Sequence, residues 1–279
     1  MPDTEVQLVV VDNGSTDDTR AELARLAQAL GRPIEVVHEG RTGLSRARNA
    51  GLAASTGDLV VFTDDDCHMN RDYILRALVA DAADGGRLTL RGGRVLLGDA
   101  RDLPLTIKLD EVSACWRKER DDAARYNLGN SLLGANLCFR RALAERVGPF
   151  DTRLGAGSSI PGGEDTDYIF RCYESGFTVA YDHTLIVRHF HGKRERDQAL
   201  SLVKNYSIGG GALVAKHILH SPKLVRQFRW DIKNAARDLL SRTNTFHPDI
   251  GFSHWDKVRW HIVGIWRFAW MSLAGRNLD

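Results

Sequence analysis

Short apolar runs alternate with amphipathic segments along the first third of the chain. Three runs have the length and β-rich composition of buried strands: residues 6–11, 34–38 and 59–63. Each is followed by a segment of helical period: residues 23–30, 44–55 and 72–83. Strands that alternate with helices predict an α/β fold with a mixed, mainly parallel sheet, which binds ligands at the C-terminal ends of its strands.

The middle of the chain is less regular, and its pattern predicts shorter elements. Residues 88–97 alternate weakly and predict one or two strands, whereas the charged residues 110–125 predict a helix. Further strands are expected at 135–140, 177–180 and 184–187, and further helices at 142–147 and 166–176. The glycine-rich residues 155–163 predict a lid, or alternatively an ordinary surface loop.

Acidic side chains follow two of the predicted strands. Asp12 ends the first strand, and three consecutive aspartates, Asp64, Asp65 and Asp66, end the third. Adjacent carboxylates repel one another, and hard oxygen ligands suit Mg2+ or Mn2+. The triplet therefore indicates either a divalent-cation site or a solvated acidic turn.

The net charge of +2 conceals an uneven distribution. Residues 186–279 hold 16 Lys and Arg against 7 Asp and Glu, which leaves 22 against 29 in residues 1–185. A basic tail favours an anionic contact such as a membrane surface or a phosphorylated acceptor, or it simply solvates helices. Four scattered cysteines without CxxC spacing, and no signal peptide, favour a cytoplasmic location.

Five motifs in order resemble those of glycosyltransferase family 2, which has the GT-A fold. They are Val-Val-Val-Asp12-Asn-Gly-Ser-Thr-Asp17, Gly43-Leu-Ser-Arg-Ala-Arg48-Asn49-Ala-Gly51, Gly57-Asp-Leu-Val-Val-Phe-Thr-Asp64-Asp-Asp66, Gly148-Pro-Phe-Asp151 and Gly163-Glu164-Asp165-Thr-Asp167. The resemblance covers roughly residues 5–192. It implies a Rossmann-like GT-A domain over residues 1–192 and a helical appendage over residues 193–279.

The resemblance implies transfer of a sugar, with inversion, from a nucleotide-sugar, often a UDP-sugar, to a carbohydrate or lipid-linked acceptor. The implied donor-binding residues are Asp12, Arg48, Asn49, Asp64 and Asp65. Asp66 is the implied ligand of Mn2+ or Mg2+, in a DxD-type motif with Asp64. His189 and His191 are further diphosphate or metal contacts, or ordinary surface or core residues.

The family also implies a carboxylate base that takes the acceptor proton. We assign Asp165 as this base and Glu164 as the residue that orients the acceptor, although the two roles are interchangeable. The alternative is that the pair only complements a helix N-terminus. Asp167 is expected to be structural.

The chain departs from the family at its start, where a first strand and helix are expected. An absent strand would leave a sheet edge unpaired and weaken donor binding. Either the sequence is truncated at its start, or another chain or a rearranged strand fills the gap. A non-catalytic scaffold or partner subunit is therefore the rival hypothesis. A Rossmann oxidoreductase lacks its GxGxxG motif, and no nucleic-acid-binding module is recognisable.

The C-terminal residues 253–275 predict an amphipathic helix that holds four of the six tryptophans. One face is apolar: Val258, Ile262, Ile265, Trp266, Ala269 and Leu273. The opposite face is small or polar: Lys257, His261, Gly264 and Arg267. Arg259 interrupts the apolar side. Aromatic and basic residues suit a membrane surface, whereas the alternative is docking on the body or on a second copy in a homo-oligomer.

Overall fold

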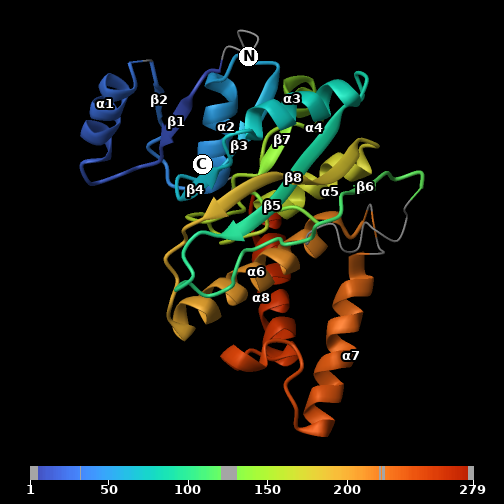
Figure 1. Cartoon of the computed structure of the whole chain (residues 1–279). Coiled ribbons are helices and arrows are strands. Elements are labelled where there is room, and N and C mark those ends of the chain that lie inside the picture. Colours follow the sequence, from blue (N-terminus) through green and yellow to red (C-terminus); the bar gives the residue numbers. More distant parts are fainter. Residues whose placement is uncertain (1–5, 32, 121–130, 220, 222–223, 276–279) are drawn as a thin grey trace.

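The computed structural model describes residues 6–31, 33–120, 131–219, 221 and 224–275. It confirms an α/β fold, with a mixed sheet flanked by helices and further helices below the sheet (Figure 1).

The strands form two separate sheets within the described part of the chain. A two-stranded sheet pairs β1 (Val9–Asp12) with β2 (Glu35–His38) in parallel. A six-stranded sheet has the order β3-β7-β5-β8-β4, and β6 also pairs with β8. Its strands are β3 (Leu59–Phe62), β4 (Cys67–Met69), β5 (Thr89–Leu97), β6 (Ala114–Trp116), β7 (Leu137–Arg140) and β8 (Thr178–His189).

The expectation of a mainly parallel sheet is wrong. In the larger sheet only β5 and β8 pair in parallel, whereas β3–β7, β5–β7, β4–β8 and β6–β8 are antiparallel. The alternation of strand and helix that predicts parallel pairing ends after β3. Strand β7, which is distant in sequence from β3, pairs antiparallel with both β3 and β5. Local periodicity does not reveal which distant strands pair or in which direction.

Helices cover both faces of the larger sheet. Side chains alternate along β7: Leu137 and Phe139 belong to the core beneath α4 and α5, whereas Cys138 belongs to the core beneath α3. The helices of this part are α1 (Thr19–Leu30), α2 (Leu44–Ala54), α3 (Tyr73–Ala83), α4 (Arg141–Val147) and α5 (Glu164–Glu174).

Three local predictions need correction. The helix expected at residues 110–125 is wrong, because residues 114–116 form β6 against β8, and residues 121–125 lie outside the described residues. Residues 177–180 and 184–187 belong to the single strand β8, whose register against β5 shifts between Gly93 and Arg94. Strand β4 was not predicted, since three residues are too few for a periodic signal.

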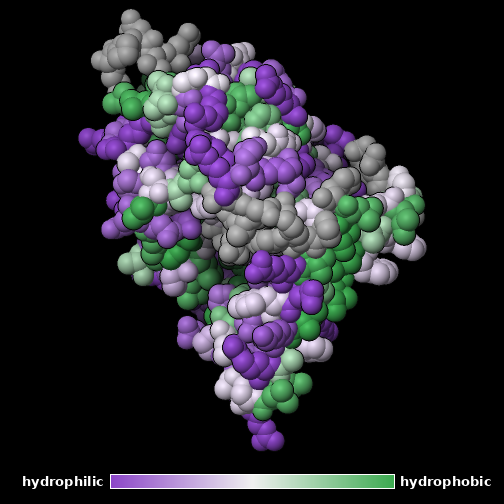
Figure 2. Space-filling view, turned by 90° about the vertical axis from the view of Figure 1, so that its right-hand side faces the viewer, coloured by the Kyte–Doolittle hydropathy of each residue, from purple (hydrophilic) through white to green (hydrophobic). Residues whose placement is uncertain are grey.

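The C-terminal region consists of α6 (Arg196–His217), α7 (Val225–Ser241), the short 3-10 helix η4 (Pro248–Ile250) and α8 (His254–Leu273). A separate core joins α6 and α8 to Leu154 and Ile160. In Figure 2, apolar residues gather along one side of the lower part of the molecule. Among the described residues, no helix has both the length and the apolar character needed to cross a membrane.

Candidate active site

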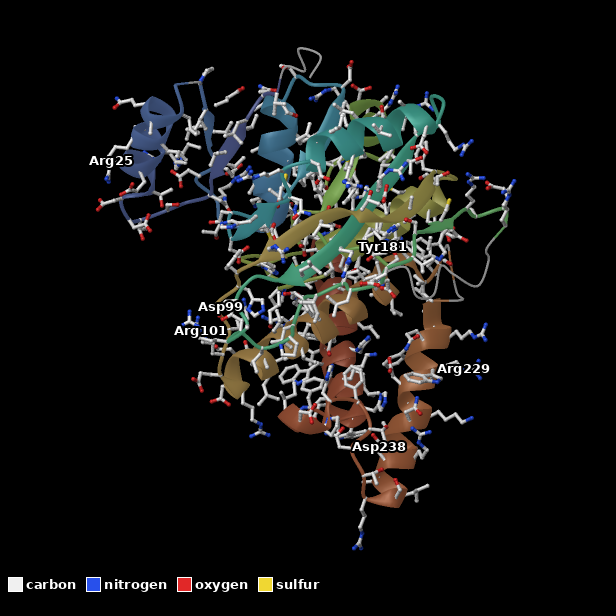
Figure 3. All side chains as sticks on the ribbon, viewed as in Figure 1. Arg25, Asp99, Arg101, Tyr181, Arg229 and Asp238 are labelled. Atoms are coloured by element: carbon white, nitrogen blue, oxygen red, sulfur yellow. The ribbon has the colours of Figure 1, made fainter. Side chains whose placement is uncertain are left out.

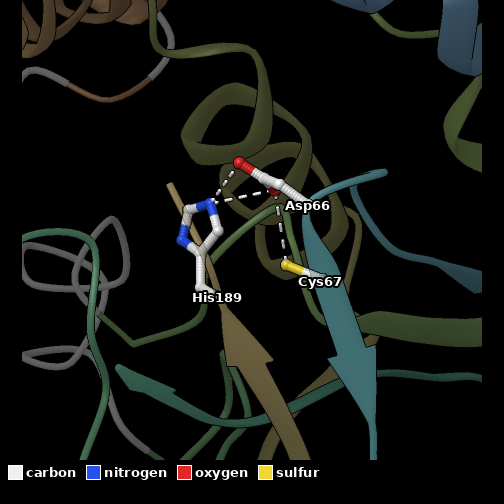
Figure 4. A group of neighbouring side chains, drawn as sticks. All are labelled: Asp66, Cys67 and His189. Carbon is white, nitrogen blue, oxygen red and sulfur yellow. Dashed lines mark hydrogen bonds and ion pairs between the residues drawn. The ribbon is translucent and has the colours of Figure 1, made fainter. Parts of the chain in front are cut away.

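Two strand ends bring Asp66 and His189 together. The aspartate triplet follows β3, and the next strand, β4, pairs antiparallel with the end of β8, where Cys67 lies opposite His189. Nε2 of His189 lies 3.1 Å from Oδ1 and 3.2 Å from Oδ2 of Asp66. Figure 4 shows the imidazole facing the carboxylate, with the Cys67 thiol beside it.

Two contacts fix the orientation of the His189 ring. Nδ1 lies 3.1 Å from the hydroxyl oxygen of Thr106, which itself donates to the carbonyl oxygen of Leu105 (2.7 Å), and this leaves Nε2 facing Asp66. Burial alone would lower the pKa of His189, but the bond to Asp66 outweighs it, and the net shift is upward. The same bond lowers the pKa of Asp66.

Asp66, Cys67 and His189 are a group whose donor atoms suit a metal ion, since all lie within 4.8 Å of one another. Burial, with the nearby Asp64 and Asp66, raises the pKa of the Cys67 thiol to about 12. A protonated thiol is a poor ligand, because metals bind the thiolate. The carboxylate of Asp66 and the imidazole of His189 therefore fit a cation such as Mn2+ better than the sulfur does.

Arg48 connects the aspartate triplet to the carboxylates of α5. The α2 side chain is buried, with Nη1 3.0 Å from Oε1 of Glu164 and Nη2 3.5 Å from Oδ1 of Asp64. Burial by itself would lower the pKa of Arg48, but Glu164, Asp64 and Asp165 raise it. Arg48 is therefore a buried, paired cation and not a solvated one on the helix surface.

The pKa of Asp64 responds to charges at the aspartate triplet and at the start of α5. Burial raises the pKa of Asp64, Arg48 opposes the shift, and Asp66 and Asp165 add to it. The sequence-predicted carboxylates at the end of β3 and at the start of α5 thus belong to one electrostatic cluster.

Helix α5 presents Glu164 and Asp165 from its first turn, where the helix dipole favours negative charge. Asp165 is partly exposed, and its two carboxylate oxygens accept from the backbone N–H groups of Gly134 (2.9 Å) and Thr166 (2.7 Å). Glu164 is buried. Its burial, reinforced by Asp165, raises its pKa even though Arg48 opposes the shift.

Three other predicted site residues, Asp12, Asn49 and Asp65, have different surroundings. Asp12 ends β1 of the smaller sheet, where hydrogen bonds from Arg20 and Ser15 hold its pKa well below the usual range. Asn49 exchanges two hydrogen bonds with the backbone of Phe150 (2.8 and 2.9 Å), a structural task. Asp65 is exposed.

His191 uses both of its ring nitrogens in local hydrogen bonds. Nδ1 accepts from the backbone N–H of Lys193 (3.0 Å), and Nε2 donates to the carbonyl oxygen of Leu103 (3.1 Å). Its ring stands edge-on to that of His189. In this arrangement His191 supports the His189 ring and offers no free nitrogen to a metal.

Sequence reasoning missed Thr106, Cys67 and Tyr206 as residues of the site. Tyr206 of α6 lies near Gly162, just before α5, and its ring remains about half exposed (49%). Partial burial of its hydroxyl, with the charges of Asp165, Glu164 and Asp64, raises its pKa. An aromatic residue within the helical tail gives no signal of its own that it faces these carboxylates.

The fold and the site define the GT-A class of glycosyltransferase folds. The family model for glycosyl transferase family 2 matches residues 2–147, and the chain belongs to that family. Glycosyltransferase AglE of Haloferax volcanii is 27% identical over 213 residues, which cover 76% of this chain and 64% of AglE. Succinoglycan biosynthesis protein ExoM of Rhizobium meliloti is 29% identical over 63% of this chain and 54% of ExoM. The chain thus spans between half and two thirds of the length of these relatives.

Solved structures agree with the fold. The crystal structure of S. aureus TarS 1–349 has a TM-score of 0.52 at 14% identity, covering 100% of this chain and 85% of that one. The same TarS segment in complex with UDP gives a TM-score of 0.50 at 15% identity, with the same coverage.

Proposed function

We propose that this chain transfers a sugar from a nucleotide-sugar to an acceptor hydroxyl, with inversion and with the help of Mn2+ or Mg2+. One observation carries the proposal: the Arg48 guanidinium contacts both Asp64, beside the cation-ligand group, and Glu164, beside the candidate base. Two motifs 100 residues apart in the sequence thereby share one site.

On the donor side, Asp66 and His189 would hold the cation, with Asp64 close by. A bound cation would stabilise the negative charge that grows on the departing nucleoside diphosphate. Asp65 is exposed and could therefore contact the donor without binding the metal, which supports its proposed donor-binding role. Family resemblance makes a UDP-sugar the proposed donor. Asp12 would form a hydrogen bond to its nucleobase.

On the acceptor side, Asp165 would take the proton as the acceptor oxygen forms a bond to the anomeric carbon and the bond to the diphosphate breaks. Its partial exposure supports this role, because a base must reach the hydroxyl it deprotonates. Glu164 is buried against Arg48, which supports a positioning role. The reverse assignment is the alternative.

The acceptor is proposed to be a growing glycan or a glycolipid. Support comes from relatives named for such pathways, ExoM for succinoglycan biosynthesis and WbaN of Salmonella anatum as an O-antigen chain rhamnosyltransferase.

A non-catalytic scaffold is the second candidate. It is favoured by the separation of the β1–β2 sheet, which carries Asp12, from the sheet whose strands end at the aspartate triplet and His189. A donor pocket shared between unpaired sheets would lack the rigidity that precise positioning requires.

Turnover of nucleotide-sugars separates the two candidates. Purified chain with Mn2+ and a panel of UDP-sugars should release UDP, and Asp66→Ala should abolish release while Asp72→Ala, on the exposed start of α3, should not. Calorimetry with UDP and Mn2+ gives an independent readout. Absence of both UDP release and UDP binding would support the scaffold instead.

A further inference from the structure

Helix α8 buries a face of mixed character and leaves a row of large apolar side chains exposed. The buried positions are His254, Val258, His261, Gly264, Phe268 and Met271. The large exposed side chains are Trp255, Ile262, Trp266, Trp270 and Leu273. At the pitch of an α-helix these five exposed positions fall within an arc of about 80°. A helix at the surface of a globular protein normally turns such an apolar stripe toward the core.

Close backbone contact with α6 fixes this orientation. A methyl group on Gly264 would lie 1.9 Å from the carbonyl oxygen of Ile208, and one on Gly211 would lie 2.0 Å from that of His261. The backbones of the two helices therefore approach closely at positions where each carries a glycine. Because the glycine face of α8 must point toward α6, the tryptophan face, defined by the five exposed residues above, is held outward.

The tryptophan face is large for an unpartnered surface. Trp266 is 64% exposed, Trp270 is 56% exposed and stacks on it, and Leu273 is 86% exposed. Contiguous apolar surface of this kind marks an interaction site. Of the apolar face expected from the sequence, Ile262, Trp266 and Leu273 are exposed and Val258 is buried. His261 and Gly264, from the opposite face, are buried as well.

The segment that contains α7 and α8 carries an excess of basic residues, which favours an anionic partner. Residues 225–273 contain eight Lys and Arg against four Asp. Three of these aspartates are used internally: Asp231 accepts from Lys257 (3.0 Å), Asp238 from Thr245, and Asp256 caps α8 with Ser253. The exposed charges are mainly basic, as for Arg229, which points outward from α7, whereas Asp238 is buried (Figure 3).

Arg259 decides between a lipid surface and a second copy. It is exposed and shares the arc of the tryptophan face. A two-fold contact through this face would bring two Arg259 side chains into one apolar interface, where like charges are costly. At a bilayer surface the same guanidinium reaches lipid phosphates while the tryptophans lie at headgroup level.

We propose that the tryptophan face of α8 lies on the surface of a bilayer that contains anionic phospholipid. The helix would lie in the plane of the interface, with Trp266 and Trp270 inserted and Arg259 at the phosphates. The contact is independent of the reaction, so it can be tested without a donor or acceptor.

Flotation of the full chain with vesicles tests this contact. The chain should float with vesicles of phosphatidylcholine and phosphatidylglycerol, and less with phosphatidylcholine alone. Trp266→Ser combined with Trp270→Ser should lower binding more than about tenfold, because two large side chains lose their burial. Leu75→Ser combined with Val79→Ser, two exposed residues of α3, is the matched control and should float like the parent.

Charge and oligomeric state complete the test. Arg259→Glu should weaken binding to the anionic vesicles about thirtyfold, since it changes two units of charge near the surface. Equal flotation of the tryptophan variant and the parent, at an unchanged melting temperature, would overturn the proposal. It would also be overturned if sedimentation velocity showed a dimer that the tryptophan variant converts to a monomer without any vesicle binding by the parent.

Discussion

Nη1 of Arg48 lies 3.0 Å from Oε1 of Glu164, and both side chains are almost fully buried. The pair joins α2 to the first turn of α5. Glu164, Asp64 and Asp165 compensate the charge of Arg48, whereas Asp165 opposes ionisation of Glu164. The contact therefore serves as both a structural link and an element of the site.

Removal of the Arg48 charge should be strongly destabilising. Arg48→Gln leaves Glu164 buried without its counter-charge, a change that costs about 3–5 kcal/mol in the free energy of unfolding. Urea unfolding should show this loss at pH 8 and a smaller loss at pH 5, where Glu164 can take up a proton. The double variant with Glu164→Gln should recover part of the loss. A strictly additive double-mutant cycle would contradict the link.

The pKa of Glu164 predicts a pH dependence of stability. Burial and Asp165 raise this pKa from 4.5 to about 7 in the folded chain. Between these values the folded state holds the proton more tightly than the unfolded state, so this residue's contribution to stability falls as pH rises. Glu164→Gln removes the effect. The stability of the variant relative to the parent should therefore increase from pH 5 to pH 8 in urea unfolding, and a constant difference would refute it.

Thr106 should affect metal affinity without being a ligand. It holds Nδ1 of His189 and adopts a positive φ of 52°, unusual for a β-branched residue. Loss of such an orienting partner costs 10- to 100-fold in affinity, roughly. Thr106→Ala should weaken Mn2+ binding by that amount in a spin-resonance titration, and Thr243→Ala, on an exposed loop, should not. Cys67→Ser should bind Mn2+ like the parent, because Mn2+ prefers oxygen and nitrogen ligands to sulfur.

Much of the fold follows from local patterns in the sequence. The strand before Asp64 and the helix at 73–83 lie within one residue of their predicted bounds because each is specified by its own periodicity. The strand that ends at Asp12 begins three residues later than predicted, and the helix after it begins four residues earlier. Long-range pairing was not accessible in this way. Strand β6 forms against β8 some 65 residues away, at Cys115 and Ala180, and its charged flanks predict a helix.

The site was predictable to the same extent. Carboxylates at strand ends can be recognised in the sequence as motifs. The residue that pairs with a buried side chain cannot be recognised in this way. Arg48 lies 116 residues from Glu164, and no local pattern distinguishes it from a solvated helix cation. The inward face of α8 escaped prediction because the close backbone approach at Gly264 and Gly211 depends on the partner helix, which a helical wheel does not contain.

The two carboxylates of α5 should separate in kinetic assays. If Asp165 is the base, Asp165→Asn should lower turnover about 10²- to 10⁴-fold. Donor binding should remain, because Asp165 contacts the backbone of Gly134 and Thr166 and is not one of the grouped donors Asp66, Cys67 and His189. Glu164→Gln should reduce turnover less and change the acceptor KM. A larger loss of turnover in Glu164→Gln would exchange the two roles.

A single methyl group at the α6–α8 contact should test how the tail is held. Gly264→Ala places a carbon 1.9 Å from the Ile208 carbonyl oxygen, and backbone there cannot yield as a side chain does. Overpacking of this kind costs about 1–3 kcal/mol. Thermal unfolding should show the loss, and hydrogen exchange should rise in α8 and in the part of α6 that faces it. Ala269→Ser, on the exposed side of the same helix, should change neither measurement. If Gly264→Ala melted like the parent, the close approach of the two helices would be refuted, and with it the reason that the tryptophan face points outward.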